Sequence, residues 1–270
     1  MQQTSSAHFD IAIAGGGPVG LALAGMLLAR DVSGSSVAVI DAKPLSEAVA
    51  DPRAIALSAG CRQLLNAIDA WPQAATAIRQ IHVSRRGSFG RTLIDAEDYQ
   101  LPALGYVCRY GDVLRSLATS LSASQIMYYR PMRIAGMTES GDGVQISLSD
   151  ETQISALVVV QAEGGIFGEQ KLKRLHRDYQ QCAIISTVWS ALPPPGRAFE
   201  RFTDQGPLAL LPMQDAYSLV WCMRPDNAER LMALDDEAFL NALQQAFGQR
   251  AGHFRKIDKR FSYPLGLNAQ

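Results

Sequence analysis

The sequence predicts an α/β fold, and three observations near its amino terminus predict it. Residues 9–14 (FDIAIA) form a short apolar run that ends at a glycine cluster, which is typical of a buried strand. Residues 18–30 begin with proline and carry no charge before Arg30, which favours a helix with proline in its first turn. Residues 37–40 (VAVI) predict a second buried strand. This order of strand, helix and strand indicates a Rossmann-like unit.

The composition is that of a globular protein, and it excludes some function classes. Of the 270 residues, 47% are hydrophobic and 19% are charged, and the net charge is -1. A chain of this length can bury a large core without metal or disulfide support. A pI near 6.4 and the lack of a Lys/Arg block argue against binding to nucleic acid. We therefore expect an ordinary soluble globular protein.

The cysteines and histidines form no recognisable metal or disulfide motif. The four cysteines lie at least 40 positions apart, and none belongs to a CxxC pair. The four histidines are equally scattered, without an HxH or HExxH arrangement. We therefore predict no metal site, and a reducing, cytoplasmic location.

Residues 11–29 form an uncharged, mostly apolar run of 19 positions, a length that also suits a membrane span or a signal sequence. A signal sequence has a basic region before its apolar stretch, whereas Asp10 precedes this run and the first basic residue is Arg30. A spanning helix would also have to accommodate residues 15–18, three glycines and a proline in succession. The run therefore predicts a strand and a helix joined by a turn.

That turn carries the pattern GxGxxG at Gly15, Gly17 and Gly20. The first glycine permits a tight turn, the second lets the backbone approach a pyrophosphate, and the third lets helix and strand pack closely. The helix N-terminus supplies free N–H groups and a partial positive charge. Asp41 ends the second strand, where an acid can accept hydrogen bonds from the hydroxyls of an adenosine ribose. We predict a dinucleotide site, and an ordinary glycine-rich turn is the alternative.

The rest of the chain predicts helices, an inserted β-meander and a β-rich second domain. Helical apolar spacing occurs at residues 58–70 and 111–122, and residues 126–160 read as strands separated by polar turns. Residues 235–247 predict an amphipathic helix, whose three leading acids suit the helix dipole better than paired-carboxylate catalysis. The β-rich segments after Gly165 are residues 182–189, 208–213 and 218–223. We expect a nucleotide-binding domain at residues 1–176 and a β-rich substrate domain at residues 177–270.

Five motifs in serial order carry a resemblance to a known family. They are the glycine cradle, DPRAIALS at 51–58, YVCRYGDVLRSL at 106–117, VVVQAEGG at 158–165, and GPLALLPM with YSLVWCM at 206–213 and 217–223. Together they resemble the flavoprotein aromatic hydroxylases, which are FAD-dependent monooxygenases. Within that family the chain is most similar to the hydroxylases of ubiquinone biosynthesis, in the 2-polyprenyl-6-methoxyphenol hydroxylase branch. The resemblance covers essentially the whole chain, and it favours FAD over NAD as the bound dinucleotide.

The resemblance implies a set of residues that bind FAD. The cradle, Gly15, Gly17 and Gly20 with Pro18 and Val19 between them, would approach the pyrophosphate. Asp41 would hold the adenosine ribose, although the family usually has the longer glutamate there, so Asp41 would need a closer backbone or a bridging water.

Two arginines are further cofactor contacts that the resemblance implies. Arg53, with Ala54, would lie beside the flavin and the pyrophosphate, and Arg109 would contact the cofactor from a helix that begins near Gly111. For Arg53 the alternative is a surface salt-bridge residue, and for Arg109 it is an ion pair with Asp112.

The fourth motif departs from the family pattern, and the fifth implies a substrate wall. Where the family has Gly-Ala-Asp-Gly, this chain has residues 161–164 (QAEG), so Glu163 is either a longer cofactor contact or a solvated turn residue. The second sheet of the family faces the flavin across the substrate cavity. Leu210, Pro212 and Trp221 would line that wall, and the alternative places them in the core of the sheet.

The resemblance also implies the reaction. NAD(P)H would reduce FAD, and the reduced flavin would activate O2 to hydroxylate the ring of a phenolic or polyprenyl substrate; no side chain is assigned as catalytic, because the flavin supplies the chemistry. The alternatives are an FAD-linked reductase or halogenase of related fold, and a non-catalytic FAD-binding subunit of a biosynthetic complex. A polyprenyl substrate implies peripheral contact with the inner face of a membrane, directly or through a partner in that complex, although no basic amphipathic helix is visible.

One further motif of the family is missing from the sequence. A Gly-Asp or Gly-Asn followed by Ala-Ala-His normally comes shortly after a segment like residues 261–267 (FSYPLGL), and the sequence stops at Gln270. We therefore expect this chain to be a truncated hydroxylase that binds FAD weakly and does not turn over. Apolar surface left by the missing part would favour a homo-oligomer.

Overall fold

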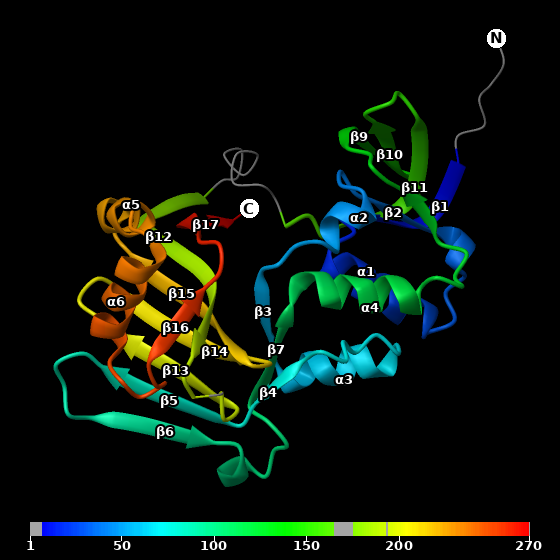
Figure 1. Cartoon of the computed structure of the whole chain (residues 1–270). Helices are drawn as coiled ribbons and strands as arrows, with labels where there is room; N and C mark the ends of the chain where they lie inside the picture. Colours follow the sequence, from blue (N-terminus) through cyan, green and yellow to red (C-terminus); the bar gives the residue numbers. More distant parts are fainter. Residues whose placement is uncertain (1–6, 165–174, 193, 270) are drawn as a thin grey trace. The chain divides into compact units, whose positions relative to one another are not determined.

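The computed structural model describes residues 7–164, 175–192 and 194–269, which form two compact units (Figure 1). Unit 1 is drawn from residues 1–52, 60–73 and 109–165, and unit 2 from residues 53–59, 74–108 and 166–270. The predicted α/β class is confirmed. The units are divided differently from the two domains expected to meet at residue 176, because two segments of the amino-terminal half cluster with the carboxy-terminal half.

Unit 1 is built on a six-stranded sheet in the order β8-β2-β1-β11-β10-β9. The pairs β8-β2, β2-β1 and β1-β11 are parallel, whereas β10 is antiparallel to both β9 and β11. The strand–helix–strand unit and the inserted meander are therefore both present. The strands are β1 (Ala7–Ala14), β2 (Val37–Ile40), β8 (Met127–Tyr129), β9 (Ile134–Ser140), β10 (Gly143–Leu148) and β11 (Gln153–Gln161).

The long apolar run near the amino terminus folds as β1 and the helix α1 (Pro18–Leu28), as predicted. α1 packs on β1, β2 and α4, and it buries Leu21 and Ala24. The helices predicted at 58–70 and 111–122 are α3 (Ala59–Ala67) and α4 (Tyr110–Ser120). The short elements are η1 (Gly34–Ser36) and α2 (Leu45–Ala48). No helix in the described part of the chain is long and apolar enough to span a bilayer.

Unit 2 contains an eight-stranded sheet in the order β16-β12-β15-β14-β13-β5-β6, with β17 paired to β12, and a three-stranded sheet β3-β7-β4. β5 is parallel to β13, which places Gln80 beside Arg197, 117 positions later. This pairing draws residues from the first half of the chain into unit 2.

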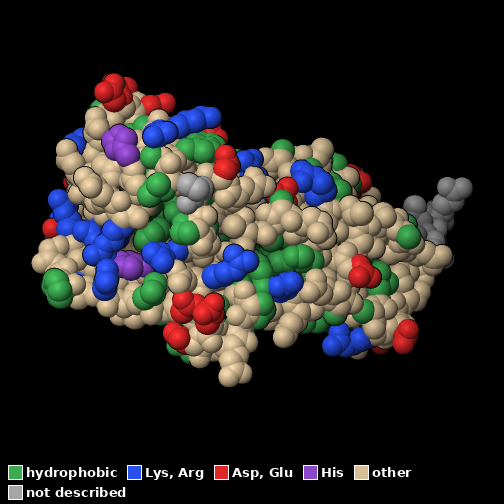
Figure 2. All heavy atoms as spheres, turned by 60° about the horizontal axis from the view of Figure 1, so that its bottom comes forward, with side chains coloured by type: hydrophobic (Ala, Val, Ile, Leu, Met, Phe, Trp, Pro, Cys, Tyr) green, Lys and Arg blue, Asp and Glu red, His purple; other side chains and the backbone are tan. Residues whose placement is uncertain are grey.

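The strands of unit 2 are β3 (Ala54–Leu57), β4 (Thr76–Ile78), β5 (Gln80–Arg85), β6 (Arg91–Asp95), β7 (Gly105–Arg109), β12 (Leu175–Ser190), β13 (Arg197–Phe202), β14 (Pro207–Met213), β15 (Ala216–Met223), β16 (Phe254–Ile257) and β17 (Phe261–Ala269). Its helices are η2 (Glu97–Tyr99), α5 (Pro225–Met232) and α6 (Asp236–Phe247). Lys and Arg side chains gather at the left of Figure 2, over the end of unit 2 where β5 and β6 meet in Figure 1.

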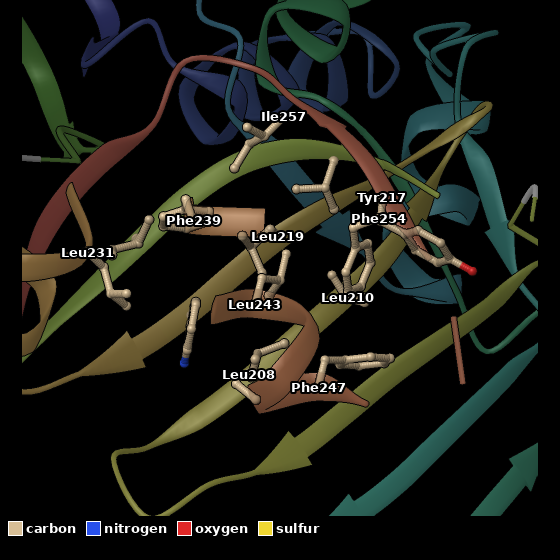
Figure 3. Close-up of a cluster of buried hydrophobic side chains, with 14 of the residues drawn as sticks. Leu208, Leu210, Tyr217, Leu219, Leu231, Phe239, Leu243, Phe247, Phe254 and Ile257 are labelled. Atoms are coloured by element: carbon tan, nitrogen blue, oxygen red, sulfur yellow. The ribbon is translucent and has the colours of Figure 1, made fainter. Parts of the chain in front are cut away.

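The core of unit 2 lies between α6 and the sheet (Figure 3). Phe239 of α6 is fully buried, and its ring meets that of Trp221 edge to face, with 5.9 Å between the ring centroids. α6 begins after Asp235, whose Oδ1 accepts the N–H of Ala238 at 2.8 Å. The helix predicted at 235–247 is therefore confirmed, and Asp235 is its N-cap.

Replacing Phe239 by alanine tests whether this cluster supports unit 2. The side chain is completely buried, so its loss removes apolar burial and leaves a cavity, and we expect the free energy of unfolding to fall by about 3–5 kcal/mol. Urea unfolding followed by circular dichroism measures the change. Asn241→Ala, at an exposed position of the same helix, is the matched control and should change stability by less than about 0.5 kcal/mol. A loss for Phe239→Ala no larger than the control's would contradict this account of the core.

Candidate functional site

The glycine loop of unit 1 lies between the end of β1 at Ala14 and the start of α1 at Pro18. Gly17 precedes the helix in an extended conformation and gives it no side-chain cap, so the first-turn N–H groups lack a capping acceptor. Pro18 occupies the first turn, and the side chain of Val19 is exposed. An uncapped helix N-terminus at the end of a parallel strand can bind an anion through its N–H groups.

Gly15 and Gly20 are required by close backbone approaches. Gly15 has φ of +107°, and a Cβ added to it would lie 2.6 Å from the carbonyl carbon of Ala162 and 2.7 Å from the nitrogen of Glu163. A Cβ on Gly20 would overlap the carbonyl oxygen of Gly15 and would lie 3.1 Å from Cγ2 of Ile13. The positive φ of Gly15 suits the predicted tight turn, and Gly20 lets the helix pack closely on the strand, whereas the approach of Ala162 to Gly15 was not predicted.

Asp41, at the end of β2, lies directly beside the glycine loop. Its Oδ2 accepts the N–H of Gly16 at 2.7 Å, and its Oδ1 accepts the N–H of Lys43 at 2.8 Å. The side chain is 19% exposed. The carboxylate of Asp41 thus bonds directly to the loop, and its contact with an adenosine ribose stays a prediction.

Arg130, just after β8, is a site residue that the sequence reading missed. Its Nη2 donates a hydrogen bond to the carbonyl oxygen of Gly16 and lies 3.7 Å from Oδ2 of Asp41. The side chain is only 9% exposed, and its buried Nε has no hydrogen-bond partner among the described residues. A buried donor without an acceptor is costly. No local sequence pattern indicates this role of Arg130. It follows from the topology, because β8 runs parallel to β2 and the residues after the two strands therefore lie side by side.

The fourth motif also reaches the loop. Ala162 follows β11, and its N–H donates to the carbonyl oxygen of Ala14 at 2.7 Å. Glu163 is exposed, and its backbone nitrogen abuts Gly15. The structure thus brings Glu163, like Asp41, to the edge of the glycine loop.

Arg109 is the N-cap residue of α4, with an exposed side chain. Its alternative partner, Asp112, is bonded instead to Nη1 of Arg115 at 2.6 Å. The N–H of Gly111 donates to the carbonyl oxygen of Asp51 at 3.3 Å, which fixes the start of α4 against the segment after α2.

The remaining predicted site residues belong to unit 2. Arg53 is exposed and precedes β3, which begins at Ala54. Leu210 is completely buried and Trp221 is 7% exposed, and both belong to the hydrophobic core that α6 covers (Figure 3). Pro212 is buried as well. Leu210 and Trp221 therefore belong to the core of the sheet, which was the alternative to a substrate wall. Side chains of α6 cover the face of the sheet on which they lie, so that face is not open to a ligand.

The unit 1 site combines hydrogen-bond donors with one acidic acceptor. Backbone N–H groups and one guanidinium offer donors, and Asp41 offers an acceptor for hydroxyl groups. No group of three His, Cys, Asp or Glu side chains among residues 7–164, 175–192 and 194–269 is placed to hold a metal ion. The uncapped N–H groups at the start of α1 and the unpartnered Nε of Arg130 both fit an incoming phosphate-bearing cofactor.

Comparison with known proteins supports the resemblance to hydroxylases of ubiquinone biosynthesis. Ubiquinone hydroxylase UbiL of Rhodospirillum rubrum is 32% identical, over 96% of this chain and 62% of that protein. An uncharacterized protein of Synechocystis, slr1300, is 30% identical, over 96% of this chain and 65% of that protein. Human ubiquinone biosynthesis monooxygenase COQ6 is 27% identical, over 93% of this chain and 58% of that protein. The chain thus spans less than two thirds of the length of these relatives.

Solved structures share the fold. PqsL of Pseudomonas aeruginosa, described as a probable FAD-dependent monooxygenase, has a TM-score of 0.74 at 19% identity, over 96% of this chain and 74% of that one. The halogenase PltM has a TM-score of 0.66 at 14% identity, over 97% of this chain and 61% of that one. The family model described as an FAD binding domain matches residues 8–262. Because that match covers both units and not the glycine loop alone, the chain belongs to the FAD binding domain family.

Proposed function

We propose that this chain forms the FAD-binding framework of a monooxygenase that hydroxylates the ring of a polyprenyl phenol in ubiquinone biosynthesis, with NAD(P)H and O2. The observation that carries the proposal is the clamp of unit 1, where a cradle without side chains, an uncapped helix and the Asp41–Arg130 pair converge. The names of UbiL and COQ6 support the ring-hydroxylation chemistry and the pathway.

The cradle would bind the pyrophosphate of FAD. The N–H groups at the start of α1 would donate to its oxygens, and Gly17, the residue before the helix, adds no side chain at this end. Asp41 would accept hydrogen bonds from the ribose hydroxyls while it keeps its bond to Gly16. Arg109, Arg53 and Glu163 are further contacts that we propose from the family motifs.

Arg130 would act as a positioning residue in this clamp. Its guanidinium holds the carbonyl oxygen of Gly16 and neighbours the Asp41 carboxylate, so it fixes both sides of the loop. An oxygen of the nucleotide is the acceptor that we propose for its unpartnered Nε.

When bound, FAD would supply the redox chemistry: two electrons from NAD(P)H and O2 would give one oxygen atom to the ring, and the other oxygen atom would leave as water. The protein residues bind and orient the cofactor and the substrate, and they exclude water from the reacting groups. We assign no side chain as a general acid or base.

Substitution of Arg130 tests its role in the clamp. We expect Arg130→Gln to raise the dissociation constant for FAD by roughly 10- to 100-fold, because charge-assisted hydrogen bonds are lost. Arg130→Lys should recover part of the loss. Isothermal titration with FAD measures the constants, and Arg133→Gln, at an exposed position three residues later, is the control. An unchanged dissociation constant for Arg130→Gln would remove Arg130 from the FAD site.

Substitution of Asp41 tests the ion pair without any cofactor. Asp41→Ala leaves the buried Arg130 guanidinium without its carboxylate, so we expect the free energy of unfolding to fall by about 2 kcal/mol. Chemical unfolding in the absence of FAD measures the loss. The control is Glu47→Ala, which breaks the solvent-exposed pair of Glu47 with Lys43 and should change stability by less than about 1 kcal/mol. Equal effects of the two substitutions would show that the Asp41–Arg130 pair carries no special weight.

Isotope labelling tests the reaction. The protein expressed from its natural reading frame, loaded with FAD, is given NAD(P)H, a polyprenyl phenol and ¹⁸O2, and the product is analysed by mass spectrometry. We expect one ¹⁸O atom in a new ring hydroxyl group. Consumption of NAD(P)H with no labelled product would favour an FAD-linked reductase, and incorporation of halide would favour a halogenase. Binding of FAD without reduction by either nicotinamide would indicate a non-catalytic subunit.

A further inference from the structure

The hairpin formed by β5 and β6 lies at the edge of the large sheet of unit 2 (Figure 1). The two strands are antiparallel, and Ser84 opposite Arg91 is the last pair before the turn. The turn itself is held by a hydrogen bond from the N–H of Ser88 to the carbonyl oxygen of Arg85, and Gly87 adopts a positive φ of 74°. The N–H of Arg86 also donates to the carbonyl oxygen of Phe202 on β13.

The tip of this hairpin carries an apolar side chain that touches little else. Phe89 is 103% exposed, and a Cβ added to either neighbouring glycine, Gly87 or Gly90, would meet no atom within 4 Å. Phe202, at the end of β13 beside Arg85, is about half exposed, and so is Leu93 in the middle of β6. A fully exposed phenylalanine keeps apolar surface in water, so its burial elsewhere is favourable.

Positive charge surrounds this apolar tip. Residues 70–94 contain no Asp or Glu, and three arginines, Arg85, Arg86 and Arg91, lie exposed on or beside the turn. The blue side chains gathered at the left of Figure 2 lie over this end of unit 2. The acidic side chain of Asp204, in the turn after β13, is also exposed on this unit.

Two arginines from distant parts of the chain add to this basic surface. Nη1 of Arg250 lies 2.9 Å from Nε2 of the buried His82 on β5, and Nη1 of Arg201 donates to the hydroxyl of Ser84 at 3.3 Å. Burial and then the nearby charge of Arg250 lower the pKa of His82. Burial, followed by repulsion from Arg250 and Arg86, lowers the pKa of Arg201. The basic side chains thus repel one another, and an anionic surface would relieve that repulsion.

We propose that the β5–β6 tip docks unit 2 onto the surface of a bilayer that contains anionic lipid, with Phe89 among the acyl chains nearest the head groups and Arg85, Arg86 and Arg91 on lipid phosphates. This proposal rests on the proposed function, because a polyprenyl substrate requires contact with a membrane. It names the β5–β6 tip as the part of unit 2 that makes that contact. Its test measures adsorption without FAD, substrate or turnover, and failure of the hydroxylation assay would leave it unaffected.

The shape of the surface favours a bilayer over other anionic partners. A single-stranded nucleic acid would need a row of aromatic platforms along a basic groove, and only one fully exposed ring stands at this tip. A bilayer offers both phosphates and apolar chains at one boundary, and it matches a ring flanked by arginines whose stems can follow it into the interface. A Cβ on Gly87 or Gly90 would meet open space, so no other part of the described chain crowds the tip.

Vesicle sedimentation tests the proposal with the 270-residue chain. Vesicles of phosphatidylcholine, with or without phosphatidylglycerol, are mixed with the protein, and the bound fraction is measured. We expect binding to the anionic vesicles that weakens at high salt, and little binding to the neutral ones. The triple variant Arg85→Gln, Arg86→Gln, Arg91→Gln should lower the partition coefficient by about fivefold for each charge removed. Phe89→Ala should lower it by about tenfold.

A matched control and a spectroscopic signal separate docking from a general charge effect. Arg224→Gln, Arg230→Gln and Arg255→Gln together remove three exposed arginines from elsewhere on unit 2 and should leave the partition coefficient within about twofold. Phe89→Trp should preserve binding, and its fluorescence should shift to the blue with anionic vesicles. Near-native secondary structure by circular dichroism confirms that each variant is folded.

Four outcomes would overturn the proposal. The first is equal loss of binding in the two triple variants. The second is no blue shift for Phe89→Trp on vesicles that bind the chain. The third is retention on heparin without binding to vesicles, which would point to a soluble polyanion. A smaller sedimentation coefficient for Phe89→Ala in lipid-free solution, with unchanged vesicle binding, would instead assign the tip to contact with a second copy of this chain and would also overturn the proposal.

Discussion

The architecture of unit 1 depends on the approach of three backbone segments to Gly15. The N–H of Gly15 donates to the carbonyl oxygen of Ile40 at 2.7 Å, and the end of β11 lies so close that a Cβ on Gly15 would overlap Ala162. The same loop starts α1, which packs on β1 and β2. A residue with a side chain at this position would separate β11 from β1 or displace the helix. The parallel sheet and the anion-binding helix terminus therefore follow from one steric constraint.

The Asp41–Arg130 pair lies on the loop that this steric constraint shapes. Both side chains are held on the Gly16 peptide, one on its N–H and the other on its carbonyl oxygen, so the loop is oriented from both sides. Removing charged groups from water is costly, and an Nε without an acceptor adds to this cost. A ligand that supplied the missing acceptor would recover part of it and would stabilise the folded chain by binding. In this arrangement Asp41 stabilises the arginine, whereas the unpartnered Nε of Arg130 lowers the stability of the chain until a ligand supplies an acceptor.

Sequence patterns predicted the features that depend on neighbouring residues. The glycine turn, α1, Asp41 at the end of β2 and the capped helix α6 each have a local signature, and each is found where expected. Arg130 has none, because its place beside Asp41 arises from the parallel pairing of β8 with β2. Alternation along β14 predicted that Leu210 faces one side of a sheet, but it could not say that α6 would cover that side. The cluster of Arg86, Arg201 and Arg250 could not be predicted either, because the pairing of β5 with β13 and the contact of Arg250 with His82 join segments far apart in the sequence.

The pairing of distant strands also constrains the order in which the chain can fold as it is synthesised. β1 is synthesised well before its neighbour β11, which begins only at Gln153, so one side of this strand of unit 1 stays open until β11 has been added. β5 likewise waits for β13, and β12 gains β17 only when residues 261–269 have been added. Pairings of this kind are slow to form, and they leave unpaired strand edges exposed in the meantime. The sheet of unit 1 can therefore be completed while β12 to β17 of unit 2 have still to be synthesised. Unit 2 is thus the unit more exposed to misassembly during synthesis.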